Sequence, residues 1–302
     1  MEEVASFPQP KPLRLAIVGF GKMGQRHAKA FGQHAGCRVV GVTDIDLGKR
    51  DHAAALGLTF AQTLNDLPDT FDAVVIATPP QSHAGLAIPL LRAGVHCLVE
   101  KPLALNAHEA GAMHSAAVSG NAVLAVGHSE RFNAGVENAL EFLGTHDATI
   151  HVQRTSNPGE RNDATDVLQD LMIHDLDWVI NEEGHFDCDV EMLESEYHQG
   201  RLVHARCTLT YGQRRYEMIA RHSNDERTRT IQIQRSDGST REFDLTGHSD
   251  GVRSSPLQRQ ASAFVDVCNG KPAPLSTGQQ ALAVMDVIEK IQIMNDLALQ
   301  SA

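Results

Sequence analysis

The sequence predicts an α/β protein in which a doubly wound parallel sheet is followed by an α/β region with a mainly antiparallel sheet. From Leu13 to about Gly127, short apolar runs alternate with helical stretches, which is typical of a parallel sheet covered on both faces. From about Val190 to Leu245, longer runs follow one another without helices, and many alternate polar with apolar residues, as in Ile231–Gln234. That alternation is typical of an antiparallel sheet with one face in water.

The first region contains five runs rich in branched apolar residues, each short enough for a strand buried on both faces. The predicted strands are 13–18, 38–43, 73–78, 95–99 and 122–126, and the predicted helices are about 22–34, 46–56, 82–93 and 107–119.

The second region mixes helices with the longer strands. The predicted helices are 134–143, about 164–181, 256–269 and 278–299, and the predicted strands are 149–155, 190–198, 202–211, 215–222, 228–235 and 240–245. Residues 236–239 (SDGS) form a hairpin turn between the last two strands. We therefore expect a flexible extension at 1–12, a nucleotide-binding domain at 13–128, and a domain at 129–302 for substrate binding, catalysis and oligomerisation.

Composition excludes several classes of protein. The chain has 302 residues and a formal net charge of -12, whereas a nucleic-acid-binding surface must be basic to displace counterions. No apolar run approaches the roughly 20 residues that span a bilayer. The first residues are acidic and then proline-rich, unlike a secretory signal, so we expect a cytoplasmic protein without membrane contact. The five cysteines form no CxxC pair, which favours reduced, structural thiols.

A phosphate-binding fingerprint follows the first strand. The segment Gly19-Phe20-Gly21-Lys22-Met23-Gly24 has the form G-x-G-x-x-G between a predicted strand and a predicted helix. The first glycine permits the tight turn, the second lets the backbone approach a pyrophosphate, and the third packs the helix against the strand. Because a helix N-terminus also attracts phosphate, we predict a Rossmann-type dinucleotide site rather than a chance glycine turn.

An acidic residue ends the second strand. Asp44 lies twenty residues after Gly24, where a carboxylate binds the ribose hydroxyls of NAD and repels the extra phosphate of NADP. Neither Thr43 nor Ile45 is basic, so the sequence favours NAD. Asp46 is close enough to share this role, and the alternative is that Asp44 only caps the second helix.

Several blocks resemble the glucose–fructose oxidoreductase and inositol dehydrogenase family, known as Gfo/Idh/MocA. Besides the fingerprint, they are ATPPQSH at 77–83, VEKPL at 99–103, GHSERFN at 127–133 and DLMIHDLD at 170–177. Ala134 stands where the family usually has proline. The resemblance covers residues 13 to about 181. It implies a Rossmann domain, then an open, mostly antiparallel sheet through which dimers or tetramers assemble.

The resemblance also implies roles for individual residues. Thr78, Pro79, Pro80 and His83 would line the cofactor groove, while Glu100 and Lys101 would lie near the nicotinamide ribose and the substrate. The matching lysine, aspartate and histidine are the family's catalytic set, which here means Lys101, Asp170 and His174.

The residue pattern supports this catalytic set. At roughly 100° per residue, Asp170, His174 and Asp177 share one helix face. Histidine suits the removal of a hydroxyl proton near neutral pH. We therefore expect His174 to act as general base, Asp170 to orient its imidazole, and Lys101 to bind the reacting oxygen. The alternatives are a solvated i,i+4 ion pair and a metal site. We expect no metal, because the sequence contains no HExxH motif and no Cys/His cluster.

Three hypotheses remain for the substrate. The blocks at 127–133 and 170–177 most resemble those of UDP-N-acetylglucosamine 3-dehydrogenases, whose products an aminotransferase converts to 3-amino sugars for lipid A. Arg131, Asn133, Arg154 and Arg161 are candidates for binding the diphosphate or sugar hydroxyls, although these arginines equally fit an ordinary surface. The second hypothesis is a dehydrogenase of a free sugar or cyclitol, and the third is an NAD-binding sensor without turnover. A basic pocket beside the cleft would favour the first, and a small closed pocket the second.

Overall fold

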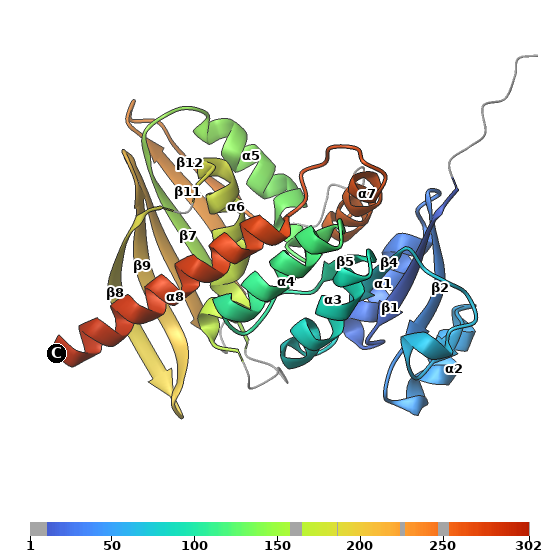
Figure 1. The fold of residues 1–302 in the computed structure, drawn as a ribbon. Helices are drawn as coiled ribbons and strands as arrows, with labels where there is room; N and C mark the ends of the chain where they lie inside the picture. Colours follow the sequence, from blue (N-terminus) through green and yellow to red (C-terminus); the bar gives the residue numbers. More distant parts are fainter. Residues whose placement is uncertain (1–10, 158–164, 186, 224–226, 247–253, 302) are drawn as a thin grey trace, which may run out of the picture.

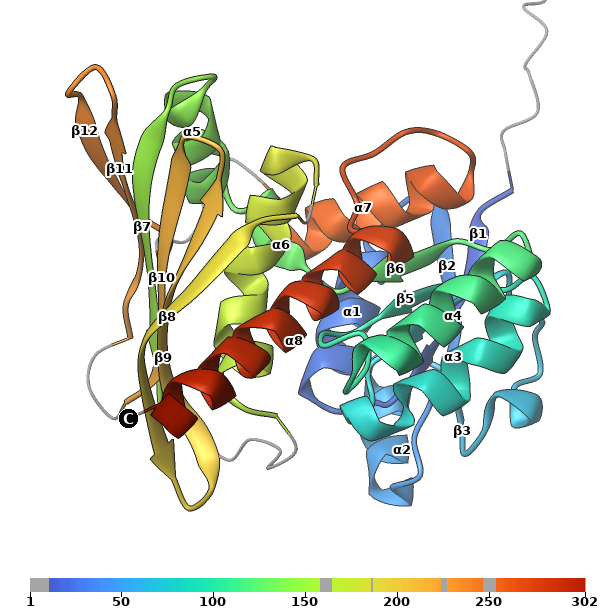
Figure 2. The ribbon, with the colours of Figure 1, turned by 60° about the vertical axis from the view of Figure 1, so that its left-hand side comes forward.

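The computed structural model describes residues 11–157, 165–185, 187–223, 227–246 and 254–301. They form two six-stranded sheets, and helices α6 and α8 lie between the second sheet and the first (Figures 1 and 2). This arrangement confirms the predicted α/β class. Among the described residues, no helix is both long and apolar enough to cross a membrane.

The first sheet is parallel throughout, in the order β3-β2-β1-β4-β5-β6. Its strands are β1 (Leu13–Val18), β2 (Cys37–Thr43), β3 (Phe60–Ala61), β4 (Ala73–Ile76), β5 (His96–Val99) and β6 (Leu124–Val126). Its own helices are α1 (Lys22–Gly32), α2 (Arg50–Ala55), α3 (His83–Arg92) and α4 (Ala107–Ser119), and α7 (Pro256–Cys268) packs beside α1. The strand order reverses between β1 and β4, and ligands bind beyond the carboxyl ends of strands at such a point.

The second sheet has the order β12-β11-β7-β10-β9-β8. Its strands are β7 (Ala148–Ser156), β8 (Asp189–His198), β9 (Arg201–Tyr211), β10 (Arg214–His222), β11 (Arg229–Arg235) and β12 (Thr240–Asp244). All neighbours are antiparallel except β7 and β10. Helices α5 (Ala134–Leu143), α6 (Ile173–Glu183) and α8 (Gly278–Ser301) lie on one face of this sheet (Figure 2).

The helix that carries the predicted catalytic residues differs from expectation at its start. It was predicted from residue 164, which lies outside the described residues, but the helical segment begins at Leu168. Asp166 accepts hydrogen bonds from the backbone N–H groups of Leu168 and Gln169 at 2.9 and 3.1 Å, and so caps it. Leu168–Met172 is a π-helical turn that continues as α6, and such turns are frequent at functional sites.

A buried ion pair attaches α6 to the second sheet. Arg154 on β7 donates to both carboxylate oxygens of Asp175 at 2.7 and 2.8 Å, and the Trp178 indole donates to the same carboxylate. The Arg154 and Asp175 side chains are only 1% and 3% exposed. Each charge is therefore stable in the core only while its partner is present.

We expect Asp175→Ala to lower the free energy of unfolding by about 3–5 kcal/mol, because it leaves the Arg154 guanidinium buried without its main counter-ion. Urea unfolding followed by circular dichroism measures this. Asp69→Ala is the matched control, because it removes a carboxylate from an exposed pair with Arg38 and should leave the midpoint almost unchanged. Equal losses in the two variants would contradict a core role for Asp175.

Candidate active site

The glycine fingerprint forms a turn that fits a dinucleotide. Gly19 has φ +89°, and a Cβ there would lie 2.6 Å from the Ala77 carbonyl oxygen at the end of β4. A Cβ on Gly24 would lie 1.9 Å from the Gly19 carbonyl oxygen, whereas one on Gly21 would meet nothing within 4 Å. Gly21 is the N-cap of α1 and makes no side-chain capping bond. The space beside Gly21, at the N-terminus of α1, is therefore open, and a pyrophosphate there would meet the helix N-terminus.

Asp44 supports this turn directly. Its carboxylate accepts hydrogen bonds from the backbone N–H of Phe20 at 2.7 Å and of Asp46 at 2.9 Å. The alternative that Asp44 caps the second helix is wrong, since Asp46 caps that segment by accepting from the Gly48 N–H. A carboxylate has about four acceptor positions, so Asp44 keeps capacity for ribose hydroxyls.

The buried side chain of His83 contacts the loop after β4. The expectation that His83 lines the cofactor groove is wrong, because it is fully buried. Its ring nitrogens lie 3.0 Å from the Pro102 carbonyl oxygen and 2.9 Å from that of Thr78. His83 thus joins the loop carrying Thr78 and Pro79 to the segment just after Lys101.

Glu100 forms a second support beneath Lys101. It accepts a hydrogen bond from the Lys101 backbone N–H at 3.2 Å, and its other oxygen lies 2.7 Å from His27 Nε2 on α1. Burial disfavours the charged carboxylate, but His27 and Lys101 outweigh this and hold the pKa of Glu100 below its ordinary value. Local sequence patterns do not indicate this role of His27, because its partner lies 73 positions away.

Lys101 and Asp170 meet as predicted, but the other partner of Asp170 was not expected. Lys101 Nζ donates to the Asp170 backbone carbonyl at 2.8 Å and to Oδ1 at 3.2 Å. Oδ2 lies 3.1 Å from Nε2 of His222, the last residue of β10. The expected partner was His174. Only the pairing of β10 with β7, which the sequence did not predict, places His222 here.

His174 lies near this cluster without a charge partner of its own. Its Nδ1 is buried and has no hydrogen-bond partner among the described residues. Burial, reinforced by the positive charges of Lys101 and Arg154, places the pKa of His174 well below its ordinary value of 6.5. The imidazole is therefore neutral near pH 7, the form that accepts a proton.

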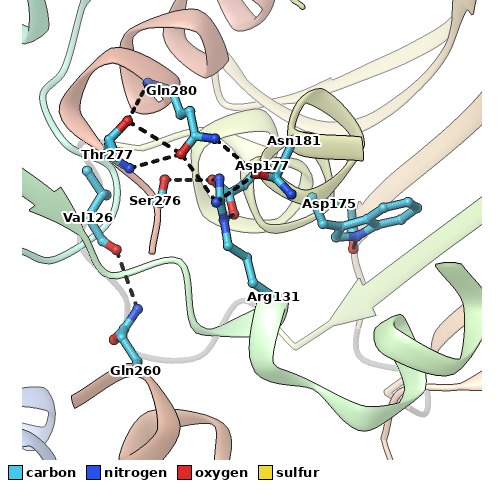
Figure 3. A network of polar contacts seen from close by, with 10 residues as sticks. Val126, Arg131, Asp175, Asp177, Asn181, Gln260, Ser276, Thr277 and Gln280 are labelled. Atoms are coloured by element: carbon cyan, nitrogen blue, oxygen red, sulfur yellow. Dashed lines mark hydrogen bonds and ion pairs between the residues drawn. The ribbon is translucent and has the colours of Figure 1, made fainter. Parts of the chain in front are cut away.

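The predicted substrate-binding residues of 127–133 make structural contacts within the protein. The Arg131 guanidinium donates to Asp177 at 2.5 and 2.7 Å and to Asn181 and Gln280, and Ser276 donates to the same aspartate (Figure 3). Asn133 caps α5 through its side-chain oxygen, and its amide N–H₂ donates to Glu130 and to a backbone carbonyl. Asn133 also lines the basic pocket described below and stays a candidate ligand, whereas Arg131 does not line it. Arg161 lies outside the described residues.

A basic pocket of about 960 Å³ opens between α1, α7 and the second sheet. Its lining begins at Met23 of the fingerprint and includes two acidic side chains, Glu130 and Asp244. The basic side chains are Arg26, Lys29, Arg227, Arg229 and Arg259. Arg229 donates to Glu130 at 3.1 Å, and its positive charge is one of those that lower the pKa of His174. Among the described residues, no group of three or more His, Cys, Asp or Glu side chains is arranged to hold a metal.

Comparison with known proteins identifies the first domain. Residues 13–128 match the model of the family described as an oxidoreductase family with an NAD-binding Rossmann fold, in agreement with the predicted cofactor. A UDP-N-acetylglucosamine 3-dehydrogenase of Acidithiobacillus ferrooxidans is 32% identical over 179 residues, 59% of this chain and 56% of the relative. An inositol 2-dehydrogenase of Arthrobacter sp. (strain FB24) is 30% identical over 179 residues, 55% and 52% of the two chains. The chain thus aligns with about half the length of these relatives.

The fold is similar over a longer stretch. A solved structure of UDP-N-acetylglucosamine 3-dehydrogenase from Acidithiobacillus ferrooxidans superposes with a TM-score of 0.81 over 94% of this chain and 97% of the other, at 23% identity. This similarity extends the shared architecture through the second sheet.

We expect Gly24→Ala to weaken NAD binding at least tenfold, because the added methyl group would collide with the Gly19 carbonyl and push α1 away from the fingerprint turn. Isothermal titration with NAD measures the loss. Gly32→Ala is the control, since Gly32 ends the same helix and its Cβ would meet nothing within 4 Å. An unchanged affinity for NAD in a folded Gly24→Ala protein would show that the glycine fingerprint does not bind the cofactor.

Proposed function

We propose that the protein oxidises a sugar hydroxyl to a ketone with NAD, because residues 13–128 match the Gfo/Idh/MocA oxidoreductase family with its NAD-binding Rossmann fold. The observation that carries this proposal is the pairing of the Lys101 ammonium with Asp170 beside a neutral His174. A cation after β5 and an uncharged base whose pKa that cation lowers suit the oxidation of an alcohol.

NAD supplies the hydride acceptor when it is bound. The chain's own residues then have three tasks. Lys101 donates a hydrogen bond to the reacting oxygen and stabilises the negative charge that develops there. His174 accepts the hydroxyl proton. Asp170 holds the lysine in place by accepting from its ammonium through the backbone carbonyl and Oδ1.

We propose UDP-N-acetylglucosamine as the substrate, oxidised at C3. Two observations favour a sugar nucleotide over a free cyclitol. One is the similarity to the Acidithiobacillus enzyme, and the other is the basic pocket, whose five cationic side chains suit a diphosphate. The ketone formed would then be available to an aminotransferase that installs a 3-amino group. We also propose that the helix-free face of the second sheet joins protomers in an oligomer.

The substrate test is NADH absorbance with NAD and a panel of UDP-sugars, free hexoses and inositols, with a ketone trap to pull the equilibrium. Reduction with UDP-N-acetylglucosamine alone supports the proposal. Reduction with inositol or a free sugar instead identifies a cyclitol or free-sugar dehydrogenase. Silence across the panel, in protein that binds NAD, would favour the sensor hypothesis.

We expect Lys101→Met to lower kcat by about 10²–10³-fold, because the reacting oxygen loses its charged donor. NAD affinity should change little. Stopped-flow NADH formation and NAD titration measure the two quantities. Lys271→Met, which removes an exposed lysine paired with Asp266, is the control for loss of a positive charge. A Lys101→Met enzyme with wild-type kcat would take Lys101 out of the mechanism.

The pH dependence follows from the lowered pKa of His174. The neutral, proton-accepting form persists as the pH falls through 6.5, because the charged form is disfavoured in the folded protein. We therefore expect kcat/KM to stay level down to about pH 6.5 and to decline only in more acidic solution. A pH-rate profile measures this, and His174→Gln should lose the acid-side decline together with most of the rate. An acid limb centred above 6.5 would contradict His174 as the base.

A further inference from the structure

Among the described residues, Lys101 and His222 each contact one oxygen of the Asp170 carboxylate. Oδ1 lies 3.2 Å from Lys101 Nζ, and Oδ2 lies 3.1 Å from His222 Nε2. The Asp170 and His222 side chains are 9% and 5% exposed, so water competes little for either contact. His222 ends β10, which is hydrogen-bonded to β7 along its length, so its position is fixed by the sheet. Asp170 is thus held at both oxygens.

Asp170 and His174, which are both among the described residues, make no hydrogen bond or ion pair with each other. His174 lies one turn further along the same helical segment, and its Nδ1 is buried without a partner among the described residues. The last torsion of an aspartate side chain is broad and permits rotation between partners. Intrinsic geometry therefore does not prevent Asp170 from turning toward His174, and the contact with His222 opposes that rotation.

We propose that His222 is a positioning residue that holds the Asp170 carboxylate toward Lys101 and away from His174. The inference rests on the proposed function only in taking His174 as the base. The consequence is a division of roles, in which the lysine keeps a counter-ion and the histidine keeps none. A base paired with a carboxylate would be protonated at a higher pH and would accept the hydroxyl proton less readily near neutrality.

The other charged groups around His174 do not replace Asp170. Lys101 after β5, His128 after β6, Arg154 on β7 and Arg229 on β11 all disfavour its protonated form. On its own helix, Asp175 and Asp177 are committed to the buried guanidinium groups of Arg154 and Arg131. Rotation of Asp170 is therefore the change that would bring a negative charge to the imidazole.

The test compares His222→Leu with His222→Gln. Leucine removes the N–H donor, whereas glutamine keeps a donor near the position of Nε2. His204→Leu is the matched control, because His204 lies on the adjacent strand β9, is similarly buried, and contacts Glu196 instead of Asp170.

The primary readout is the titration of the His174 ring by NMR in histidine-labelled protein, assigned with His174→Gln. We expect its midpoint to rise by about one pH unit or more in His222→Leu, the size of shift that a new opposite charge gives. It should stay near the wild-type value in His222→Gln and in His204→Leu. In turnover assays, the acid limb of kcat/KM should move with it, kcat should fall about tenfold, and NAD affinity should be unchanged.

An unchanged His174 midpoint in folded His222→Leu would overturn the inference. A raised His174 midpoint in His222→Leu, in a protein whose wild type turns over no substrate, would support His222 as a positioning residue. The same result would contradict the proposed function. If His222→Leu does not fold, His222→Asn replaces it, because its shorter amide falls short of the carboxylate. A His174 midpoint that is the same in the Asn and Gln variants would then overturn the inference.

Discussion

The contact between the Lys101 ammonium and Asp170 is the constraint on which the rest of the site depends. Lys101 follows a strand of the first sheet, and Asp170 lies in the π-helical turn that leads into α6 on the second sheet, so their 3.2 Å contact links the two sheets. The lysine segment is itself braced by buried groups. Glu100 accepts from the Lys101 backbone N–H, His27 holds Glu100, and His83 contacts the Pro102 carbonyl. A group fixed this firmly costs little reorganisation when charge develops beside it.

The buried charges around α6 differ from Lys101 in how completely they are enclosed. Arg154 is paired with Asp175, and Arg131 with Asp177, each through two hydrogen bonds and almost without exposure. Isolated buried charges are costly, so these pairs are locked together. The Lys101 side chain is 18% exposed and so keeps some contact with solvent. The buried arginines therefore serve to hold α6 in place, and the proposed catalytic roles are left to Lys101 and His174.

The sequence predicted the parts of the fold that local patterns determine. The bounds of β1, α4 and α5 and the glycine turn before α1 were correct, because hydrophobic period and turn chemistry act over a few residues. It missed the two-residue strand β3, the parallel pairing of β7 with β10 and the π turn at Leu168–Met172. For the site, the family resemblance predicted that Lys101 and Asp170 lie together, but no pattern predicted the contacts of His27 and His222. Those contacts join residues 73 and 52 positions apart. They depend on the order of the strands in the sheets, which local periodicity does not encode.

The catalytic cluster and the basic pocket have different consequences for substrate choice. A lysine, a carboxylate and a neutral histidine act on a CH–OH group whatever molecule carries it, so the same set serves cyclitols and sugar nucleotides. Discrimination must arise where substrates differ, and a diphosphate differs from a free sugar mainly in its charge. The pocket that begins at Met23 and reaches Arg229 carries an excess of positive side chains in a protein of net charge -12. Arg26, Lys29 and Arg227 are exposed to solvent, while Arg229 and Arg259 are paired with Glu130 and Glu137. The positive potential of the exposed side chains attracts anions, which supports the proposal of a phosphorylated substrate on grounds other than the similarity to a relative.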